Sequence, residues 1–154
     1  MHSAHQLARQ LAELKAAKVA DGVPDAVVIG ADTIVVAGAG ILGKPMDDDD
    51  AARMLRVLSG NRHHVVTAVA VVRRQPPVRL IDSCETAVWF RRLTEDEISR
   101  YVASGEPLDK AGAYGIQGRA ATFVERIDGD YFTVVGLPLA RLAQLLAHAD
   151  IQLP

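Results

Sequence analysis

The chain has 154 residues, a formal net charge of −2 and a sequence pI near 6.2. Its 49% apolar and 23% charged content are ordinary for one globular domain with its own core. This charge excludes the basic footprint of a duplex nucleic-acid binder, and no apolar run is long enough to span a membrane. The single cysteine, Cys84, excludes an intrachain disulfide and fits a reducing compartment, so we expect a soluble, cytoplasmic protein.

The first predicted element is an amphipathic helix over residues 3–20, whose apolar face is expected from Leu7, Leu11 and Leu14 at helical spacing. After a turn, the β-branched run 26–30 predicts a buried strand that resumes at 33–36. Glycines then return the chain into a short second strand, so a hairpin is expected.

That glycine-rich turn also imitates two nucleotide-binding patterns. Gly38, Gly40 and Gly43 match G-x-G-x-x-G, and the extension to Lys44 resembles a P-loop. Both mechanisms need a helix N-terminus directly after the glycines, whereas Pro45 stands where a P-loop has its Ser or Thr. The hairpin interpretation is therefore preferred to either one.

Four consecutive aspartates at 47–50 open the next predicted helix, which ends at Ser59-Gly60. We interpret them as caps that complement the helix dipole, and a divalent-metal cluster is the alternative.

The second half of the chain predicts two long antiparallel strands, a helix, a hairpin and a last helix. The strands cover 65–72 and 78–90, and a capping box at 94–97 starts the helix. Residues 122–127 and 131–135 flank Asp128-Gly129, which indicates a hairpin, and Pro138 opens the final helix.

Asp32 is the most informative single residue, because a carboxylate inside an apolar strand is costly to bury unpaired. It is either satisfied by backbone amides or a lysine, or it acts as a metal ligand or general base. The glycine-punctuated segment 106–118 adds Lys110 and Gln117, and Lys44 precedes it. A polyphosphate site needs cations that bind the phosphates, an acid, and an amide that can bind the edge of a base. Each of these residues, considered alone, could be an ordinary surface residue. We expect the aspartate and this segment to contribute to one site.

Five segments together closely resemble the Maf family of nucleoside triphosphate pyrophosphatases. They are Gly30-Ala31-Asp32-Thr33, Leu42-Gly43-Lys44-Pro45, Leu58-Ser59-Gly60, the run from Asp109 to Gly118, and Val135-Gly136-Leu137-Pro138-Leu139. The resemblance implies a single mixed α/β domain over residues 1–154, similar to Maf and ITPase folds, with an elongated twisted sheet and a central cleft. It also implies a homodimer.

The activity implied by the resemblance is hydrolysis of a nucleoside triphosphate to the monophosphate and pyrophosphate, supported by Mg²⁺ or Mn²⁺. Asp32 resembles the family's proton acceptor and metal ligand. Thr33 and Gln117 resemble its specificity positions, and Lys15, Lys44 and Lys110 its phosphate-facing lysines. The form of the segment around Gln117 is similar to the branch that prefers dTTP and UTP, since an amide can both donate and accept at a thymine or uracil edge.

The chain departs from the family pattern in one respect. We expect it to lack the N-terminal strand and the Ser-x-Ser-Pro-Arg-Arg loop that are usual in the family. Arginines of such a loop bind phosphates through bidentate hydrogen bonds, so we expect the activity of a chain without them to be low. Two alternatives follow: a weak or inactive nucleotide- or partner-binding protein that restrains septum formation and cell division, or a folded remnant without function.

Overall fold

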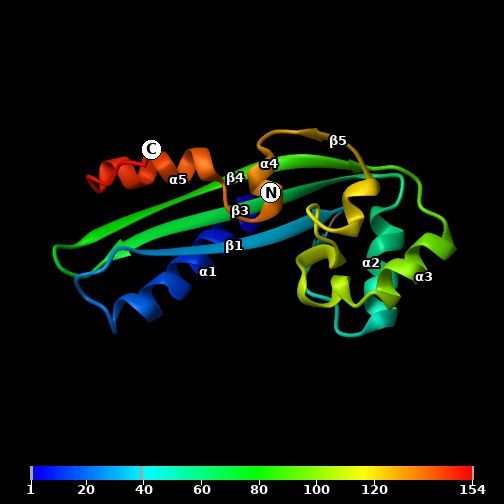
Figure 1. Ribbon diagram of the computed structural model, residues 1–154, viewed down its shortest axis with the longest axis horizontal. Helices are drawn as coiled ribbons and strands as arrows, with labels where there is room; N and C mark the ends of the chain where they lie inside the picture. Colours follow the sequence, from blue (N-terminus) through cyan, green and yellow to red (C-terminus); the bar gives the residue numbers. More distant parts are fainter. Residues whose placement is uncertain (1, 39, 154) are drawn as a thin grey trace. The chain divides into compact units, whose positions relative to one another are not determined.

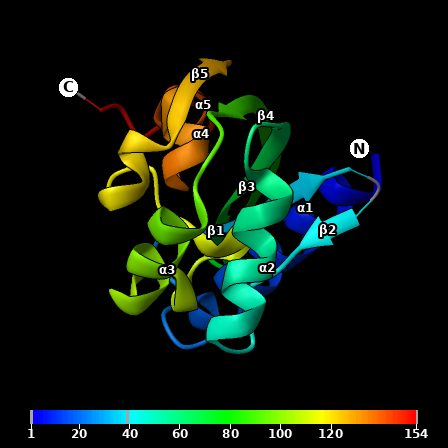
Figure 2. The ribbon, with the colours of Figure 1, turned by 90° about the vertical axis from the view of Figure 1, so that its right-hand side faces the viewer.

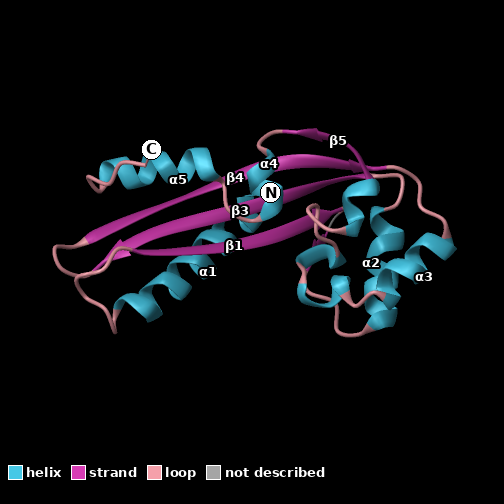
Figure 3. Cartoon of the chain, viewed as in Figure 1, coloured by secondary structure: helices cyan, strands magenta, loops and turns pink. Residues whose placement is uncertain are grey.

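The computed structural model describes residues 2–38 and 40–153 (Figures 1 and 3). Its helices and strands follow in chain order: α1 (His2–Ala20), β1 (Val28–Ala37), β2 (Gly40–Leu42), α2 (Asp48–Leu58), β3 (Arg62–Arg73), β4 (Val78–Phe90), α3 (Glu95–Ala103), η1 (Glu106–Asp109), η2 (Ala111–Ala113), η3 (Arg119–Thr122), β5 (Val124–Asp128), α4 (Tyr131–Val135) and α5 (Leu139–His148).

The strands form one sheet in the order β2-β1-β3-β4-β5, which confirms the mixed α/β class. β1 pairs antiparallel with β2, and the returning strand expected from the sequence is confirmed. Ala39, which lies between them in the sequence, is outside the described residues. β3 and β4 are neighbours joined by four residues, a connection short enough to require antiparallel strands.

Two compact units can be distinguished in the chain. Unit 1 contains residues 1–33, 66–85 and 132–154, and unit 2 contains residues 34–65 and 86–131. β1, β3 and β4 contribute residues to both units.

In unit 1, α1 packs against β1 through alanines. The buried positions share a four-residue spacing and are Ala4, Ala8, Ala12, Ala16 and Ala20. The prediction that leucines form the apolar, buried face of α1 is wrong in detail, since Leu14 is 66% exposed. The reason is close approach: a Cβ added to Gly30 would lie 2.4 Å from the Ala12 carbonyl oxygen and 2.9 Å from Ala16 Cβ. Larger side chains would hold the helix away from the strand.

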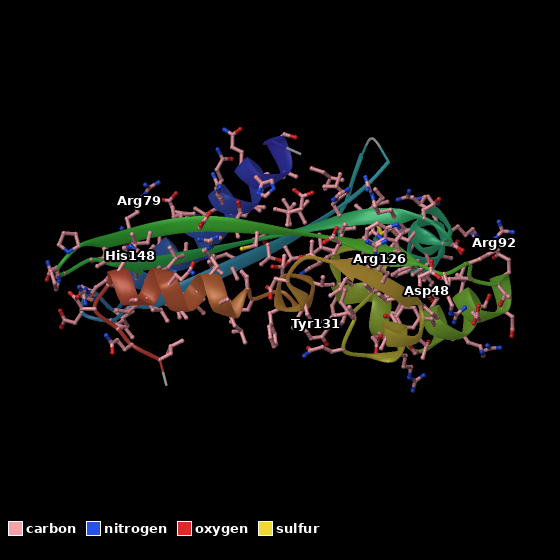
Figure 4. All side chains as sticks on the ribbon, turned by 90° about the horizontal axis from the view of Figure 1, so that it is seen from above. Asp48, Arg79, Arg92, Arg126, Tyr131 and His148 are labelled. Carbon is pink, nitrogen blue, oxygen red and sulfur yellow. The ribbon has the colours of Figure 1, made fainter. Side chains whose placement is uncertain are left out.

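Helix α5 lies on the face of the unit 1 sheet opposite α1 (Figure 4). Leu142 and Leu146 pack with Val71 there, and the predicted last helix is confirmed. Arg79, which Figure 4 labels on the α1 side of β4, donates to Glu13 at 3.0 Å. Within the described residues, no helix has the length and apolar content needed to cross a bilayer.

The hairpin predicted across Asp128-Gly129 is wrong in its second half. β5 pairs antiparallel with β4, but the following residues form helix α4. The β-branched and aromatic composition of α4 favours a strand, and its tertiary setting overrides that preference. Thr133 is fully buried and its carbonyl accepts a hydrogen bond from the Thr67 hydroxyl at 2.7 Å, which holds this segment on the sheet.

In unit 2, α2 and α3 pack against each other and against the short η helices (Figure 2). Both predicted helix starts are confirmed. Asp47 caps α2 by accepting from the Asp50 amide at 2.8 Å, and Thr94 and Glu97 form a reciprocal capping box on α3. The cap by Asp47 supports the capping interpretation of the aspartate run, and among the described residues no group of three or more His, Cys, Asp or Glu could hold a metal ion.

An aromatic cluster with one histidine forms the centre of unit 2. His63 and Tyr114 stack edge-on against Phe90, and His63 Nε2 lies 2.6 Å from the Tyr114 hydroxyl. Burial lowers the pKa of His63 to about 4, and the charge of His64 acts in the same direction. His63 is therefore neutral at pH 7, and its Nε2 shares one hydrogen bond with the Tyr114 hydroxyl.

We expect Gly30→Ala to lower the free energy of unfolding by at least about 2 kcal/mol, because the new methyl group would meet backbone atoms of α1. Gly40→Ala is the matched control, since a Cβ there has nothing within 4 Å and the change should stay within about 0.5 kcal/mol. Urea unfolding measures both. Equal effects for the two variants would contradict the close-packing argument.

The His63 environment predicts acid sensitivity. The pKa of His63 in the folded protein, about 4, lies below the ordinary 6.5. The stability that neutral His63 contributes is therefore complete above pH 6.5 and is lost as the pH falls towards 4. The total loss is about 3 kcal/mol, at about 1.4 kcal/mol per pH unit. Urea unfolding at pH 7.5 and pH 5 should show a smaller pH dependence for His63→Phe than for the wild type. The same dependence in both would exclude His63 as the source.

Candidate active site

Asp32 lies in the middle of β1 and pairs with a lysine of α1. The Lys15 ammonium is 2.6 Å from Asp32 Oδ1 and donates to the Ala31 carbonyl at 3.2 Å. The Asp32 side chain is 15% exposed, whereas that of Lys15 is 57% exposed. A largely covered carboxylate is thus held by a solvent-accessible cation, which fixes its orientation.

Asp32 and Thr33 point to opposite faces of β1, because successive side chains of a strand alternate. Their contacts agree: Asp32 meets α1, whereas Thr33 Oγ1 lies 2.9 Å from Thr67 Oγ1 on β3. Two adjacent residues of one motif therefore have different surroundings. Both were expected at the site, and the backbone separates their side chains.

The two lysines expected in unit 2 lie in segments that are tied together. The Gly112 amide donates to the Gly43 carbonyl at 3.1 Å, which joins the segment after β2 to the η2 turn. Lys110 donates to Asp109 at 2.9 Å, and this hydrogen bond lowers the pKa of the Asp109 carboxyl. The charge of Lys44 acts in the same direction, so both lysines lie near this one carboxylate.

The η2 turn has a backbone that demands small residues. Gly112 has φ +72°, and a Cβ there would lie 2.9 Å from Val35 Cγ2. Ala113 also has a positive φ, of 66°, and is fully buried. Non-glycine residues adopt this conformation at a cost and persist in it only where the surroundings enforce it. Tyr114, which shares a hydrogen bond with His63, holds the backbone directly after Ala113.

Glu106 closes the segment that carries Gln117. Its Oε1 accepts from the Arg119 amide at 3.3 Å, and a Cβ on Gly118 would lie 2.2 Å from the same oxygen. Burial raises the pKa of Tyr101, with a hydrogen bond to Glu106 as a further cause. Gln117 itself is exposed, so its amide is presented to solvent from a braced backbone.

Sequence reasoning missed these supporting residues. Glu106 begins the segment already singled out, and its glycines were a signal that something approaches closely, but nothing in the sequence identified the partner. Thr67 carries no signal at all, since a β-branched residue in a strand is ordinary.

The expected site residues divide between the units. Lys15, Asp32 and Thr33 belong to unit 1. Lys44, Lys110 and Gln117 belong to unit 2. The expectation that all six contribute to one site stays a prediction.

A hollow of about 420 Å³ in unit 1 is lined by His5, Arg9, Glu13 and Arg79, and Asp32 does not line it. Its arginines are engaged, because Arg9 donates to Ser83 and Arg79 to Glu13. Because both arginines are already hydrogen-bonded within unit 1, this hollow does little to favour an anion-binding site.

Known proteins resemble this chain over most of its length. The family model described as Maf-like protein matches residues 1–149. The chain is 57% identical over 139 residues to a dTTP/UTP pyrophosphatase of Geobacillus sp. (strain WCH70), covering 90% of this chain and 74% of that protein. A protein of the same name from Alkaliphilus metalliredigens (strain QYMF) is 51% identical over 150 residues, which are 96% of this chain and 78% of the relative.

A third relative, the dTTP/UTP pyrophosphatase of Moorella thermoacetica (strain ATCC 39073 / JCM 9320), is 57% identical over 137 residues, or 89% of this chain and 71% of the relative. The resemblance drawn from the five sequence segments is confirmed by a match of this extent. The chain belongs to the Maf family.

Proposed function

We propose that this chain hydrolyses a nucleoside triphosphate to the monophosphate and pyrophosphate, with Asp32 as the proton acceptor. The observation that carries the proposal is the Asp32 carboxylate, largely covered in mid-strand and held by Lys15 at 2.6 Å. The relatives named dTTP/UTP pyrophosphatase support the reaction class. An aspartate in this setting costs free energy unless it is paired, and its remaining oxygen is available for chemistry.

The proposed roles follow from the two oxygens of Asp32. Lys15 engages Oδ1, so Oδ2 is the atom that we assign to the reaction. There it accepts a proton from water as the water oxygen forms its bond to the α-phosphorus. The bond between that phosphorus and the bridging oxygen breaks, and pyrophosphate leaves with the electron pair. Lys15 positions the carboxylate and balances its charge.

Lys44 and Lys110 are assigned to the charge on the leaving pyrophosphate. The shared effect of both lysines on the Asp109 pKa supports a common role, because it requires their charges to lie near one carboxylate. Asp109 moderates this positive charge in the absence of substrate. A triphosphate competes for the lysines with three or four negative charges where Asp109 offers one.

A divalent cation, Mg²⁺ or Mn²⁺, fits Asp32 as a single carboxylate ligand. Within residues 2–38 and 40–153 there is no group of three acidic, His or Cys side chains to form a complete protein cage. Mg²⁺ is commonly held by one or two carboxylates together with substrate phosphates and water, which is the arrangement that this chain can offer. When bound, such an ion supplies charge stabilisation at the phosphates.

The finer assignment is the base. Gln117 presents an amide that can donate to O4 and accept from N3–H of thymine or uracil, so we propose dTTP and UTP as substrates. Its exposure and its braced backbone support this role. A single Maf-like domain over residues 1–154, the homodimer and the cytoplasmic location stay proposals.

Asp32→Asn should lower kcat for UTP hydrolysis with Mg²⁺ by about 10²- to 10⁴-fold, because the amide cannot accept the proton. Pyrophosphate release measures the rate. The control is Asp82→Asn, which removes a carboxylate of unit 1 paired with Arg9 and Arg141, and it should keep wild-type activity. Wild-type release no greater than that of Asp32→Asn would favour the non-catalytic alternative.

Gln117→Met should lower kcat/KM for UTP by about tenfold, mainly through KM, because it removes the amide but keeps the length of the side chain. Gln144→Met on the exposed face of α5 is the matched control and should leave both constants unchanged. Steady-state kinetics with UTP and dTTP give the result. An unchanged KM in Gln117→Met would remove Gln117 from base recognition.

A further inference from the structure

Three groups in unit 1 form a hydrogen-bonded relay that ends at Thr33. The Thr67 hydroxyl donates to the Thr133 carbonyl at 2.7 Å. The same Thr67 oxygen lies 2.9 Å from the Thr33 hydroxyl oxygen. Thr67 and Thr133 are fully buried, whereas Thr33 is partly exposed. The relay therefore runs from the interior of unit 1 to an accessible hydroxyl.

Counting hydrogens decides the direction of the relay. A threonine hydroxyl has one hydrogen to donate and two lone pairs with which to accept. The hydrogen of Thr67 is engaged by the Thr133 carbonyl, so the hydrogen between the two threonines must come from Thr33. Thr33 then has no hydrogen left for a ligand. Towards solvent its oxygen is an acceptor only.

Space beside the Thr33 oxygen is kept open by a glycine. A Cβ added to Gly136 would lie 3.5 Å from Thr33 Oγ1, and the φ of Gly136, +120°, is one that other residues rarely adopt. Any side chain at position 136 would stand against the oxygen that the relay presents. The bare backbone leaves room for a ligand group to approach it.

We propose that Thr67 is a positioning residue for substrate specificity, because it forces Thr33 to accept a hydrogen bond from the nucleoside. This inference rests on the proposed function. The group that Thr33 reads must be a donor, and thymidine and uridine nucleotides carry two kinds: the imide N3–H of the base and the sugar hydroxyl. Cytosine presents an unprotonated N3 at the same position, so an acceptor-only Thr33 disfavours it.

The test compares substrates that differ by one donor. Pyrophosphate release with Mg²⁺ gives kcat and KM for UTP against CTP, which lacks N3–H, and for dTTP against its 3′-deoxy analogue, which lacks the sugar hydroxyl. In Thr67→Val the Thr33 hydrogen is released and can rotate outwards to donate. We expect one of the two preferences to fall at least about fivefold through KM, the equivalent of one hydrogen bond, and kcat for UTP to stay within about threefold.

Three control variants separate positioning from packing. Thr67→Ser keeps the hydroxyl and should keep the preference. Thr86→Val removes another fully buried threonine hydroxyl that donates to a backbone carbonyl, that of Asp130 at 2.8 Å, and should leave both preferences unchanged. Thr33→Val should lose the same preference as Thr67→Val, and the double variant should lose no more than either single one.

The outcomes are distinct. A folded Thr67→Val with both preferences intact overturns the role of Thr67 and leaves the proposed function in place. A wild type that releases no pyrophosphate from UTP or dTTP overturns the proposed function and this inference with it. If Thr67→Val does not fold, Thr67→Ala gives the same reading, with wild-type preferences counting against the role.

Discussion

The closeness of α1 to β1 is the constraint on which the ion pair between Lys15 and Asp32 in unit 1 depends. Gly30 has no side chain, and the alanines at positions 12 and 16 of α1 are the smallest that a helix can offer there, so the two backbones almost touch. Lys15 lies within the same turn of the helix, and Asp32 lies two residues along the same face of the strand. The ion pair at 2.6 Å is thus a consequence of backbone proximity. A bulkier contact would place the ammonium out of reach.

Those parts of the fold that depend on local chemistry could be predicted from the sequence. The capping box at Thr94, the cap at Asp47 and the returning strand β2 each rest on neighbouring residues, and all three are confirmed. The buried face of α1 could not be predicted, because hydrophobicity favours leucine while the contact selects for size. α4 was missed for a related reason: its composition favours a strand, and the hydrogen bond from Thr67 comes from 66 residues away.

For the candidate site, a motif identifies residues but not the directions of their side chains. The Gly-Ala-Asp-Thr segment singled out Asp32 as a carboxylate inside a strand and, by the family resemblance, Thr33 as a specificity position, yet strand geometry turns the two side chains to opposite faces. Their partners follow from that division. Asp32 pairs with a cation of α1, whereas Thr33 joins a chain of neutral hydroxyls. One short motif thus supplies an ionic group on one face and a neutral acceptor on the other.

In unit 2 the exposed side chains depend on a buried framework that has little freedom. Gly112 fits against Val35, Ala113 is held at positive φ, and the Glu106 carboxylate occupies the space that a side chain at Gly118 would take. A loop free to move would have to be ordered when a nucleotide binds, at a cost in affinity for every immobilised residue. Strain built in during folding removes that cost from the binding step. The backbone that carries the exposed Gln117 is therefore held by the residues on either side of it.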